Sequence, residues 1–145
     1  MIIIKRISTN EAIIVRHPVL REGKPIDSCK FNGDDLPSTF HLGAFFKSEL
    51  IGVVTILKNK NNLVSNNHQF QLRGMAVLHK FQKKGIGISL VKTAEEKIKE
   101  LNGTLIWLNS RQIAVEFYSK LGFEKIGEEF NIDKIGPHYT MIKYL

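Results

Sequence analysis

One strand–turn–helix–strand segment limits the fold of this chain more than any other stretch. Apolar and polar side chains alternate over residues 69–77, which is the period-two pattern of a strand. A turn that contains Gly85 and Gly87 follows, and after it come a helix over about residues 86–101 and the apolar strand TLIWL at 104–108. Because such a crossover is right-handed, the two strands are expected to be parallel.

Hairpins are expected on both sides of this unit. FHLGAFF and LIGVVTIL, at residues 40–46 and 50–57, are apolar runs separated by KSE, and a strand over about residues 123–130 precedes HYTMIKYL at 138–145. MIIIKRI, at residues 1–7, is typical of an edge or early strand. Antiparallel hairpins around a parallel pair predict an α+β fold with a mixed sheet.

Capping residues indicate two further helices. Ser8 or Thr9 can cap a helix after the first strand, and Pro18 is expected to limit that helix or to bend it. Asn109 or Ser110 is expected to cap a helix after the strand at 104–108. The apolar residues that this helix is expected to turn inward are Ile113, Phe117 and Leu121.

Composition predicts a globular protein with a single domain over residues 1–145. The chain is 43% hydrophobic and 24% charged, and it has no apolar run long enough for a membrane span, so no membrane partner is expected. Cys29 is the one cysteine, which excludes an internal disulfide and favours a reducing, cytoplasmic location. The five histidines show no metal-ligand spacing, so we expect no metal.

The formal net charge of +7 suggests an anionic partner. Nucleic acid, a membrane surface or a phosphorylated small molecule would all fit, and so would a surface on which lysines only improve solubility. The lysines are dispersed, and no basic strand is interleaved with aromatic residues. We therefore do not expect a nucleic-acid partner.

The turn before the long helix is suited to an anion. The first backbone N–H groups of a helix lack partners, and the helix dipole adds partial positive charge there. Gly85 and Gly87 allow close approach, so the amides of residues 83–88 could surround a phosphate, and Lys83 and Lys84 would add positive charge. Taken alone, the two glycines favour no more than a tight connection between strand and helix.

With its neighbours the turn resembles a known family. Gln82 to Gly87, QKKGIG, is similar to the acetyl-coenzyme A signature Q/R-x-x-G-x-G/A of the GNAT superfamily of N-acetyltransferases, and Ala114 followed by FYSKLGF at 117–123 is similar to its second signature. The resemblance covers residues 65–145, while the first 60 residues agree in element order. It implies a GNAT-like fold with six to seven strands, a central parallel pair splayed around the cofactor, and about four helices.

The resemblance also implies the donor and its contacts. Acetyl-CoA would be the co-substrate, with its pyrophosphate on the amides around residues 82–88 and its pantetheine arm along the strand at 75–77. Tyr118 would protonate the departing thiolate. Arg111 stands where the family has asparagine, so either Arg111 or Asn109 could touch the cofactor. The residues expected at the cofactor are Met75, Ala76, Val77, Gln82, Lys83, Lys84, Gly85, Ile86, Gly87, Ile88, Asn109, Arg111, Ala114 and Tyr118.

The acceptor side is less defined. Arg73 and Gln71 lie on the polar face of the strand at 69–77 and are expected at the acceptor, although Arg73 could instead pair with an acidic residue. His138, in the last hairpin, is the first candidate for the general base and is expected at the acceptor as well. A water relay is equally compatible with the sequence. The other candidates for the base are Glu128, Glu129, Asp34 and Asp35.

These features predict an N-acetyltransferase that moves an acetyl group from acetyl-CoA to a small amine or a peptide amine. The alternative is a catalytically silent domain that binds acyl-CoA as a sensor or partner module. The family sets its acceptor with the early helices and their loop, here about residues 16–40, and with the last hairpin. A homodimer is possible, because the final strands could pair between subunits.

Overall fold

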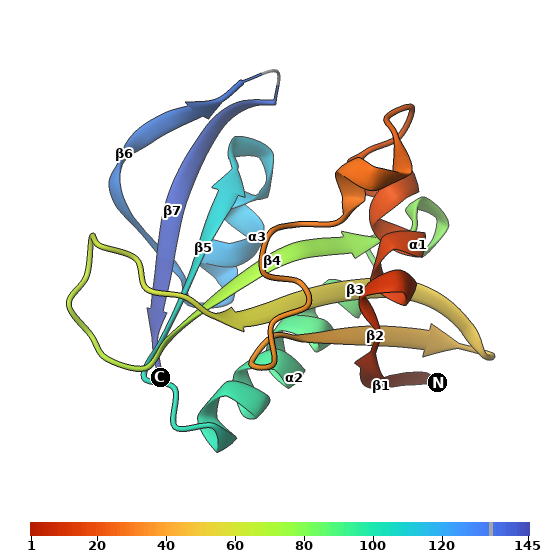
Figure 1. The fold of residues 1–145 in the computed structure, drawn as a ribbon, viewed down its shortest axis with the longest axis horizontal. Coiled ribbons are helices and arrows are strands. Elements are labelled where there is room, and N and C mark those ends of the chain that lie inside the picture. Colours follow the sequence, from red (N-terminus) through yellow and green to blue (C-terminus); the bar gives the residue numbers. More distant parts are fainter. Residues whose placement is uncertain (134) are drawn as a thin grey trace. The chain divides into compact units, whose positions relative to one another are not determined.

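The computed structural model describes residues 1–133 and 135–145 (Figure 1). These residues form two compact units. The first unit comprises residues 1–57 and 72–97, and the second comprises residues 58–71 and 98–145. Strand β4 contributes to both, since its first three residues belong to the second unit and the rest to the first. The expectation of a single domain stays a prediction.

The described residues form a seven-stranded sheet in the order β1-β2-β3-β4-β5-β7-β6. β4 and β5 are parallel, whereas the pairs β1–β2, β2–β3, β5–β7 and β6–β7 are antiparallel. The expected mixed, mostly antiparallel sheet with one central parallel pair is therefore confirmed. The strands are β1 (Ile2–Ile7), β2 (Phe40–Phe46), β3 (Glu49–Lys58), β4 (Gln69–Val77), β5 (Leu105–Arg111), β6 (Glu124–Ile132) and β7 (Gly136–Tyr144).

Three α-helices and three short 3-10 helices complete the described part of the chain, where about four helices were expected. None of these helices is both long enough and apolar enough to cross a membrane. The α-helices are α1 (Thr9–Leu20), α2 (Ile86–Glu100) and α3 (Val115–Lys120), and the 3-10 helices are η1 (Ile26–Cys29), η2 (His79–Phe81) and η3 (Gln112–Ala114).

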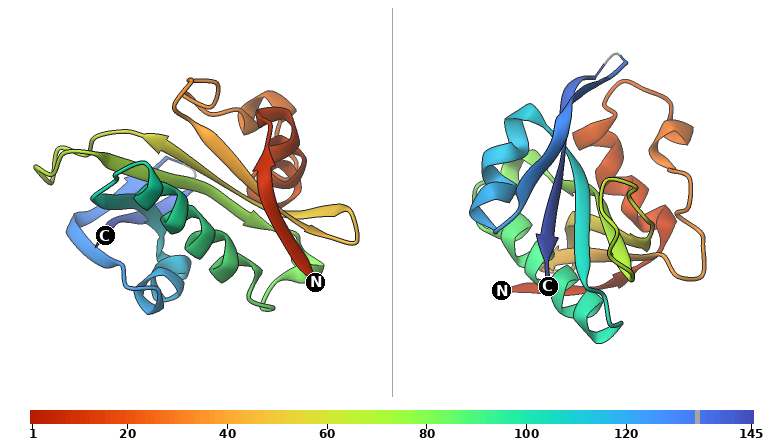
Figure 2. Two further views of the ribbon diagram at one scale, coloured as in Figure 1. Left: turned by 90° about the horizontal axis from the view of Figure 1, so that it is seen from below. Right: turned by 90° about the vertical axis from the view of Figure 1, so that its left-hand side faces the viewer.

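In the first unit, α1 and α2 cover opposite faces of the sheet (Figure 2). Neighbouring residues of a strand point to opposite faces, and β3 shows this at its centre. Val53 belongs to a buried cluster with Ala12 of α1. A Cβ atom at Gly52 would instead lie 3.2 Å from both Ile86 and Leu90 of α2. The small residue at position 52 thus lets α2 pack close to the strand.

Helix α1 begins where the sequence predicts and continues past Pro18. The Ser8 side-chain oxygen accepts a hydrogen bond from the Glu11 N–H at 3.1 Å, and the Glu11 carboxylate accepts one from the Ser8 N–H at 2.9 Å, which is a complete capping box. Pro18 does not end the helix, which runs to Leu20. A proline in the last turn removes only one donor, so the last residues can stay helical.

The second unit contains the parallel pairing, in which residues 69–71 of β4 lie beside residues 105–107 of β5. Trp107 packs with Leu105 and Ile142 in the core of this unit. The indole N–H of Trp107 donates to the Asn59 carbonyl at 2.8 Å, so the polar atom of this buried ring is paired.

The expected cap of the helix after β5 is wrong, and so is the expected burial of Ile113. Asn109, Ser110 and Arg111 continue β5 and pair with β7, so hydrogen bonds between strands hold them extended where a helix start was expected. Helix α3 begins only at Val115, after η3. Ile113, expected to be buried, is 90% exposed. In this turn Tyr118 is buried, while Phe117 and Leu121 are half-buried.

Candidate functional site

The turn from β4 to α2 is closed by its own polar groups in the first unit. The Leu78 N–H donates to the Ile51 carbonyl at 2.8 Å, and η2 follows directly. The side-chain amide of Gln82 donates to the Val77 carbonyl at 2.9 Å. Gln82, expected at the cofactor, therefore fastens the turn to the end of β4 through its side chain.

Two residues of this turn adopt left-handed backbone conformations. Lys83 has φ = 62° and Gly85 has φ = 82°, a region that is costly for most side chains. A Cβ atom at Gly85 would meet no atom within 4 Å. The left-handed backbone conformation thus explains why glycine stands at position 85, whereas crowding by neighbouring atoms does not. The space next to the Gly85 Cα atom is open.

The backbone amides of residues 83–88 are uncommitted. Among the described residues none accepts a hydrogen bond from them, and the first bond of α2 runs from the Ser89 N–H to the Gly85 carbonyl at 3.1 Å. Lys83 and Lys84 are exposed beside these amides. Free N–H groups, a helix start and two lysines together form a site that favours a phosphate.

Strand β4 has a left-handed residue, Gly74, just before Met75, Ala76 and Val77. Gly74 has φ = 64°, and a Cβ atom there would lie 3.1 Å from Nε of Arg16. The Ala76 side chain is buried in the core cluster of α1, while Met75 and Val77 are half-buried. At Ala76 only the backbone is therefore left to contact a ligand.

A buried arginine with a carboxylate partner lies behind this strand. Arg16 of α1 and Asp34 both have fully buried side chains, and Nη1 and Nη2 of Arg16 donate to the two Asp34 oxygens at 2.6 and 3.2 Å. Arg16 also donates to the Cys29 carbonyl at 2.8 Å and to the Thr55 hydroxyl at 2.7 Å. The arginine thus joins α1, the loop after it and β3.

Arg73 shares the same carboxylate. Its Nη2 atom lies 3.1 Å from Asp34 Oδ1 and also donates to the Asn32 carbonyl. The ion pair that the sequence left open for Arg73 is therefore formed. The Arg73 side chain stays 19% exposed, whereas that of Asp34 is fully covered.

These contacts decide the charge of Asp34. Burial alone would raise its pKa, but the hydrogen bonds from Arg16, from the Phe31 N–H and from Arg73, with the attraction of Arg16, hold the pKa below its usual value. A carboxylate that is buried, ionised and bound by two guanidinium groups is a poor base for an acceptor amine. Asp35, the other acidic candidate in this loop, pairs with Lys30 at 2.6 Å.

The polar face of β4 is already occupied in the second unit. The side-chain oxygen of Gln71 accepts a hydrogen bond from the Asn59 amide at 3.0 Å, and Gln71 is buried. Gln69 holds the loop before β4, donating to the carbonyls of Val64 and Asn66. The strand face that the sequence pattern left available is thus used to fasten the loop of residues 59–67.

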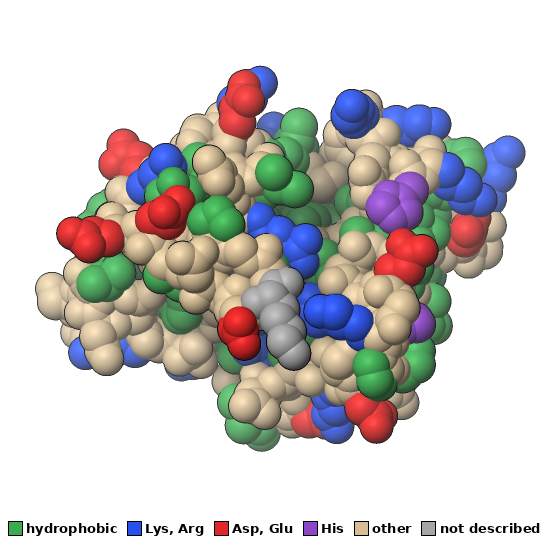
Figure 3. Space-filling view, turned by 90° about the horizontal axis from the view of Figure 1, so that it is seen from above, with side chains coloured by type: hydrophobic (Ala, Val, Ile, Leu, Met, Phe, Trp, Pro, Cys, Tyr) green, Lys and Arg blue, Asp and Glu red, His purple; other side chains and the backbone are tan. Residues whose placement is uncertain are grey.

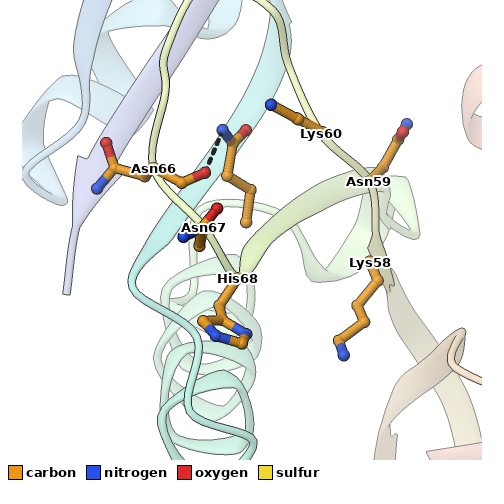
Figure 4. Close-up of a pocket in the computed structure, with 7 residues that line it drawn as sticks. Lys58, Asn59, Lys60, Asn66, Asn67 and His68 are labelled. Carbon is orange, nitrogen blue, oxygen red and sulfur yellow. Dashed lines mark hydrogen bonds between the residues drawn. The ribbon is translucent and has the colours of Figure 1, made fainter.

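A polar hollow of about 420 Å³ lies beside this loop, lined by residues 58–60 and 66–69 (Figure 4). The hydrogen bond between the Gln69 amide and the Asn66 carbonyl, 2.9 Å long, crosses it. Lys58, Asn59 and Lys60 are exposed. The one buried polar side chain of the lining is therefore already paired, and we assign the hollow no part in the chemistry.

Tyr118 is the buried residue of α3. Its ring packs edge-on against Phe117 at 5.0 Å and against Phe123 at 5.7 Å between ring centroids. Burial raises the pKa of the Tyr118 hydroxyl far above its ordinary value, so the phenol keeps its proton at all physiological pH values. Ala114, which begins the second signature, lies in η3 and is half-buried.

The other expected residues of the second unit lie on β5 and β7. The Asn109 side-chain oxygen accepts a hydrogen bond from the Thr140 hydroxyl at 2.9 Å. The Arg111 side chain has no hydrogen-bond or ion-pair partner among the described residues. His138 is buried, pairs with Arg111 in the ladder, and has its Nδ1 atom 2.9 Å from the Gly136 carbonyl.

Neither the distribution of surface charge nor a cluster of metal-ligating side chains indicates a further site among the described residues. Lys and Arg side chains are interspersed with Asp and Glu on the face drawn in Figure 3, without one continuous basic stripe. Within residues 1–133 and 135–145, no group of three or more His, Cys, Asp or Glu side chains could hold a metal ion.

Comparison with known proteins identifies the family. Residues 31–145 match the model of the acetyltransferase (GNAT) domain. The chain belongs to the GNAT acetyltransferase family. The expectations of this family and of an N-acetyltransferase are thereby confirmed. A relative, the uncharacterized N-acetyltransferase YitI of Bacillus subtilis, is 34% identical over 145 residues, which are all of this acetyltransferase and 97% of YitI.

Solved structures agree on the fold. An aminoglycoside 6'-N-acetyltransferase complexed with coenzyme A has a TM-score of 0.78 at 17% identity, covering 98% of this chain and 96% of that one. The ribosomal-protein-S18-alanine N-acetyltransferase of Escherichia coli also has a TM-score of 0.78, at 14% identity, covering 99% and 94%. At such identities the likeness establishes the GNAT fold alone.

Arg16, Thr55 and His41 are the polar residues of this region that the sequence pattern did not single out. Arg16 does carry a signal, because it lies among the buried positions Ala12 and Val15 of α1, where an apolar residue is usual. A charged residue on the inner face of a helix indicates a buried partner. The sequence does not indicate which carboxylate that partner is.

We predict that Asp34→Asn lowers the free energy of unfolding by about 3–5 kcal/mol, because it leaves the buried guanidinium of Arg16 without a counter-charge. Urea denaturation followed by circular dichroism measures this. Asp35→Asn is the matched control, since its pair with Lys30 is exposed and such pairs contribute little to stability. Equal losses for the two variants would contradict the assignment.

His41 provides a pH test of the same cluster. Burial, with the charges of Arg16 and Arg73, lowers its pKa, although contacts with Asp34 oppose this. A histidine with a folded pKa below about 6.5 contributes stability that is present above pH 6.5 and is lost as the pH falls toward the folded pKa. We predict that His41→Gln reduces the fall in unfolding free energy between pH 7.5 and 5.5. An unchanged pH dependence would show that His41 is not the group involved.

Proposed function

We propose that this acetyltransferase moves the acetyl group of acetyl-CoA to a primary amine by direct attack of the amine on the thioester. The observation that carries this proposal is the set of uncommitted amides at residues 83–88 beside Lys83 and Lys84. Coenzyme A contains a pyrophosphate, which is the kind of group that such amides bind. The coenzyme A in the aminoglycoside acetyltransferase structure of the same fold supports this choice of donor.

The proposed cofactor contacts follow from what the side chains leave free. Ala76 is buried in the core, so the segment from Met75 to Val77 would contact the pantetheine arm through its backbone, as a neighbouring strand would. Asn109 already bonds Thr140, whereas Arg111 has no partner among the described residues. We therefore assign the cofactor contact of this position to Arg111, whose guanidinium suits a phosphate.

Tyr118 would act as the proton donor to the leaving sulfur. The raised pKa of its buried hydroxyl keeps the proton in place until negative charge develops on the sulfur. A free thiol has a pKa of about 8.5, so the leaving group needs a hydrogen bond more than a strong acid. A protonated phenol in a dry environment supplies such a bond.

His138 would accept the proton from the amine. If Nδ1 donates to the Gly136 carbonyl, as the 2.9 Å distance allows, Nε2 is the unprotonated nitrogen of a neutral ring. The described residues offer no hydrogen-bond partner to Nε2. The ring is thus oriented and has one free acceptor, as a general base requires.

We predict that Tyr118→Phe lowers kcat by roughly 10²-fold and leaves the Kd of acetyl-CoA unchanged, because only the developing charge on sulfur loses its donor. Thiol release from acetyl-CoA with a broad panel of amines measures kcat. Tyr139→Phe is the matched control, since it removes a phenol hydroxyl that bonds Glu129 instead. If acetyl-CoA binds and no amine accelerates thiol release, the domain is a silent acyl-CoA-binding module and the enzyme proposal fails.

We predict that Gly87→Glu weakens binding of coenzyme A by more than about 10-fold, because a carboxylate in the first turn of α2 would repel the pyrophosphate. Isothermal titration calorimetry measures the Kd. Asn10→Glu adds the same charge at an exposed position of α1 and should leave the Kd unchanged. Unchanged affinity in a folded Gly87→Glu protein would mean that the turn is only a tight connection.

A further inference from the structure

We propose that Arg73 binds an acidic group on the acceptor, so that the acceptor is an amine that also carries a carboxylate or a phosphate and is not a polycation. This inference rests on the proposed function, which it makes more specific. It depends on the hydrogen-bond donors that Arg73 has left, on the surplus of positive charge around Phe31, and on the fixed position of the Arg73 head group.

The hydrogen-bond donors of Arg16 and Arg73 are used unequally. A guanidinium group has five N–H donors. Arg16 uses all four on its Nη atoms, for Asp34, Cys29 and Thr55, and only its Nε lacks an acceptor among the described residues. Arg73 uses only Nη2, for Asp34 and Asn32. Both donors of Arg73 Nη1 lack an acceptor among the described residues, and its buried Nε lacks one too.

Positive charge is in excess around this group. The guanidinium carbons of Arg16, Arg21 and Arg73 lie 4.1, 5.4 and 5.7 Å from the centroid of the Phe31 ring. The described part of the chain gives these three groups a single carboxylate partner, Asp34.

The next carboxylate in the loop does not remove this excess. Asp35 pairs with Lys30 at 2.6 Å, and that pair is itself neutral. His41, which also faces Asp34, has a lowered pKa and adds no charge at neutral pH. A partly buried surplus of arginine charge favours an anionic ligand and disfavours a cationic one.

The head group of Arg73 is held before any ligand arrives. Asp34 and the Asn32 carbonyl fix Nη2, and the Phe31 ring lies close by, so little side-chain entropy is left to lose on binding. The side chain is still 19% exposed, which leaves it reachable. A fixed, reachable and partly unsatisfied guanidinium is suited to recognising a carboxylate or a phosphate.

Arg73 also lies on the strand that the proposed function uses. It precedes Met75 by two residues in β4, and Met75 begins the segment assigned to the pantetheine arm. An acid group bound at Arg73 would hold the amine of the same molecule near the donor strand. Polyamines and aminoglycosides carry several positive charges, so the same group would repel them.

The test compares matched acceptors at saturating acetyl-CoA. Glycine, β-alanine and phosphoethanolamine are compared with glycinamide and β-alaninamide, which lack the acid group, and with spermidine and kanamycin, which are polycations. The inference predicts that kcat/KM is about 10-fold or more higher for the acid-bearing amines. The other amines have no acid group and therefore cannot form the hydrogen bonds to the charged Arg73 side chain. The phosphoethanolamine arm distinguishes a phosphate from a carboxylate. Equal or better use of the amides or polycations overturns the proposal.

Two variants assign the preference to Arg73. Arg73→Gln should raise KM for the acid-bearing amines by about 10-fold or more, with kcat and the Kd of acetyl-CoA unchanged, and so remove their advantage over the amides. Arg73→Lys keeps the charge and should retain part of the preference. Arg6→Gln, an exposed position in β1, is the control and should keep the wild-type preference. A preference that survives in folded Arg73→Gln overturns the proposal.

Binding is measured separately, so that failure of the proposed function can be distinguished from failure of this inference. Saturation-transfer NMR with coenzyme A present reports binding of each amine without turnover. If acid-bearing amines bind in an Arg73-dependent way but no amine is acetylated, the proposed function fails and the recognition by Arg73 stands. If none of them binds at millimolar concentrations while coenzyme A does, the inference fails.

Discussion

The ion pair between Arg16 and Asp34 organises the first unit of this acetyltransferase. Both side chains are fully buried. Burying either charge alone would be very unfavourable, so Arg16 and Asp34 can be buried only as a pair. The pair joins α1 to the loop at Cys29 and to Thr55 of β3. These bonds hold the long loop between α1 and β2, which has little regular secondary structure of its own.

The same pair also shapes the strand assigned to the cofactor. Arg16 Nε lies against Gly74, where β4 takes a left-handed conformation and where any larger residue would press on the guanidinium. Arg73, one residue earlier, shares the Asp34 carboxylate. The left-handed residue of β4 and the head group of Arg73 therefore both lie against one buried ion pair, so stability and site geometry in this unit depend on the same contacts.

Local patterns in the sequence were sufficient for most of the fold. The alternation in β4, the apolar spacing of α2 and the cap before α1 act between near neighbours, so they can be interpreted without the tertiary structure. The errors arose where residues distant in the sequence determine the local structure. Asn109 to Arg111 would suit a helix start, but β7 pairs with them, and Ile113 is consequently exposed. The partner of Arg16 lies in another element, and no periodicity reveals it.

The shared carboxylate restricts which side chains position 73 can hold. An acidic residue at 73 would place a second negative charge beside Asp34, where Arg16 alone would have to neutralise both. Replacing Asp34 by a neutral residue would remove the second negative charge but leave the buried charge of Arg16 without a partner. An exchange of Arg73 for an acidic residue is therefore expected to need a compensating change at position 16 or 34, whereas a neutral residue at 73 leaves the pair of Arg16 and Asp34 in place.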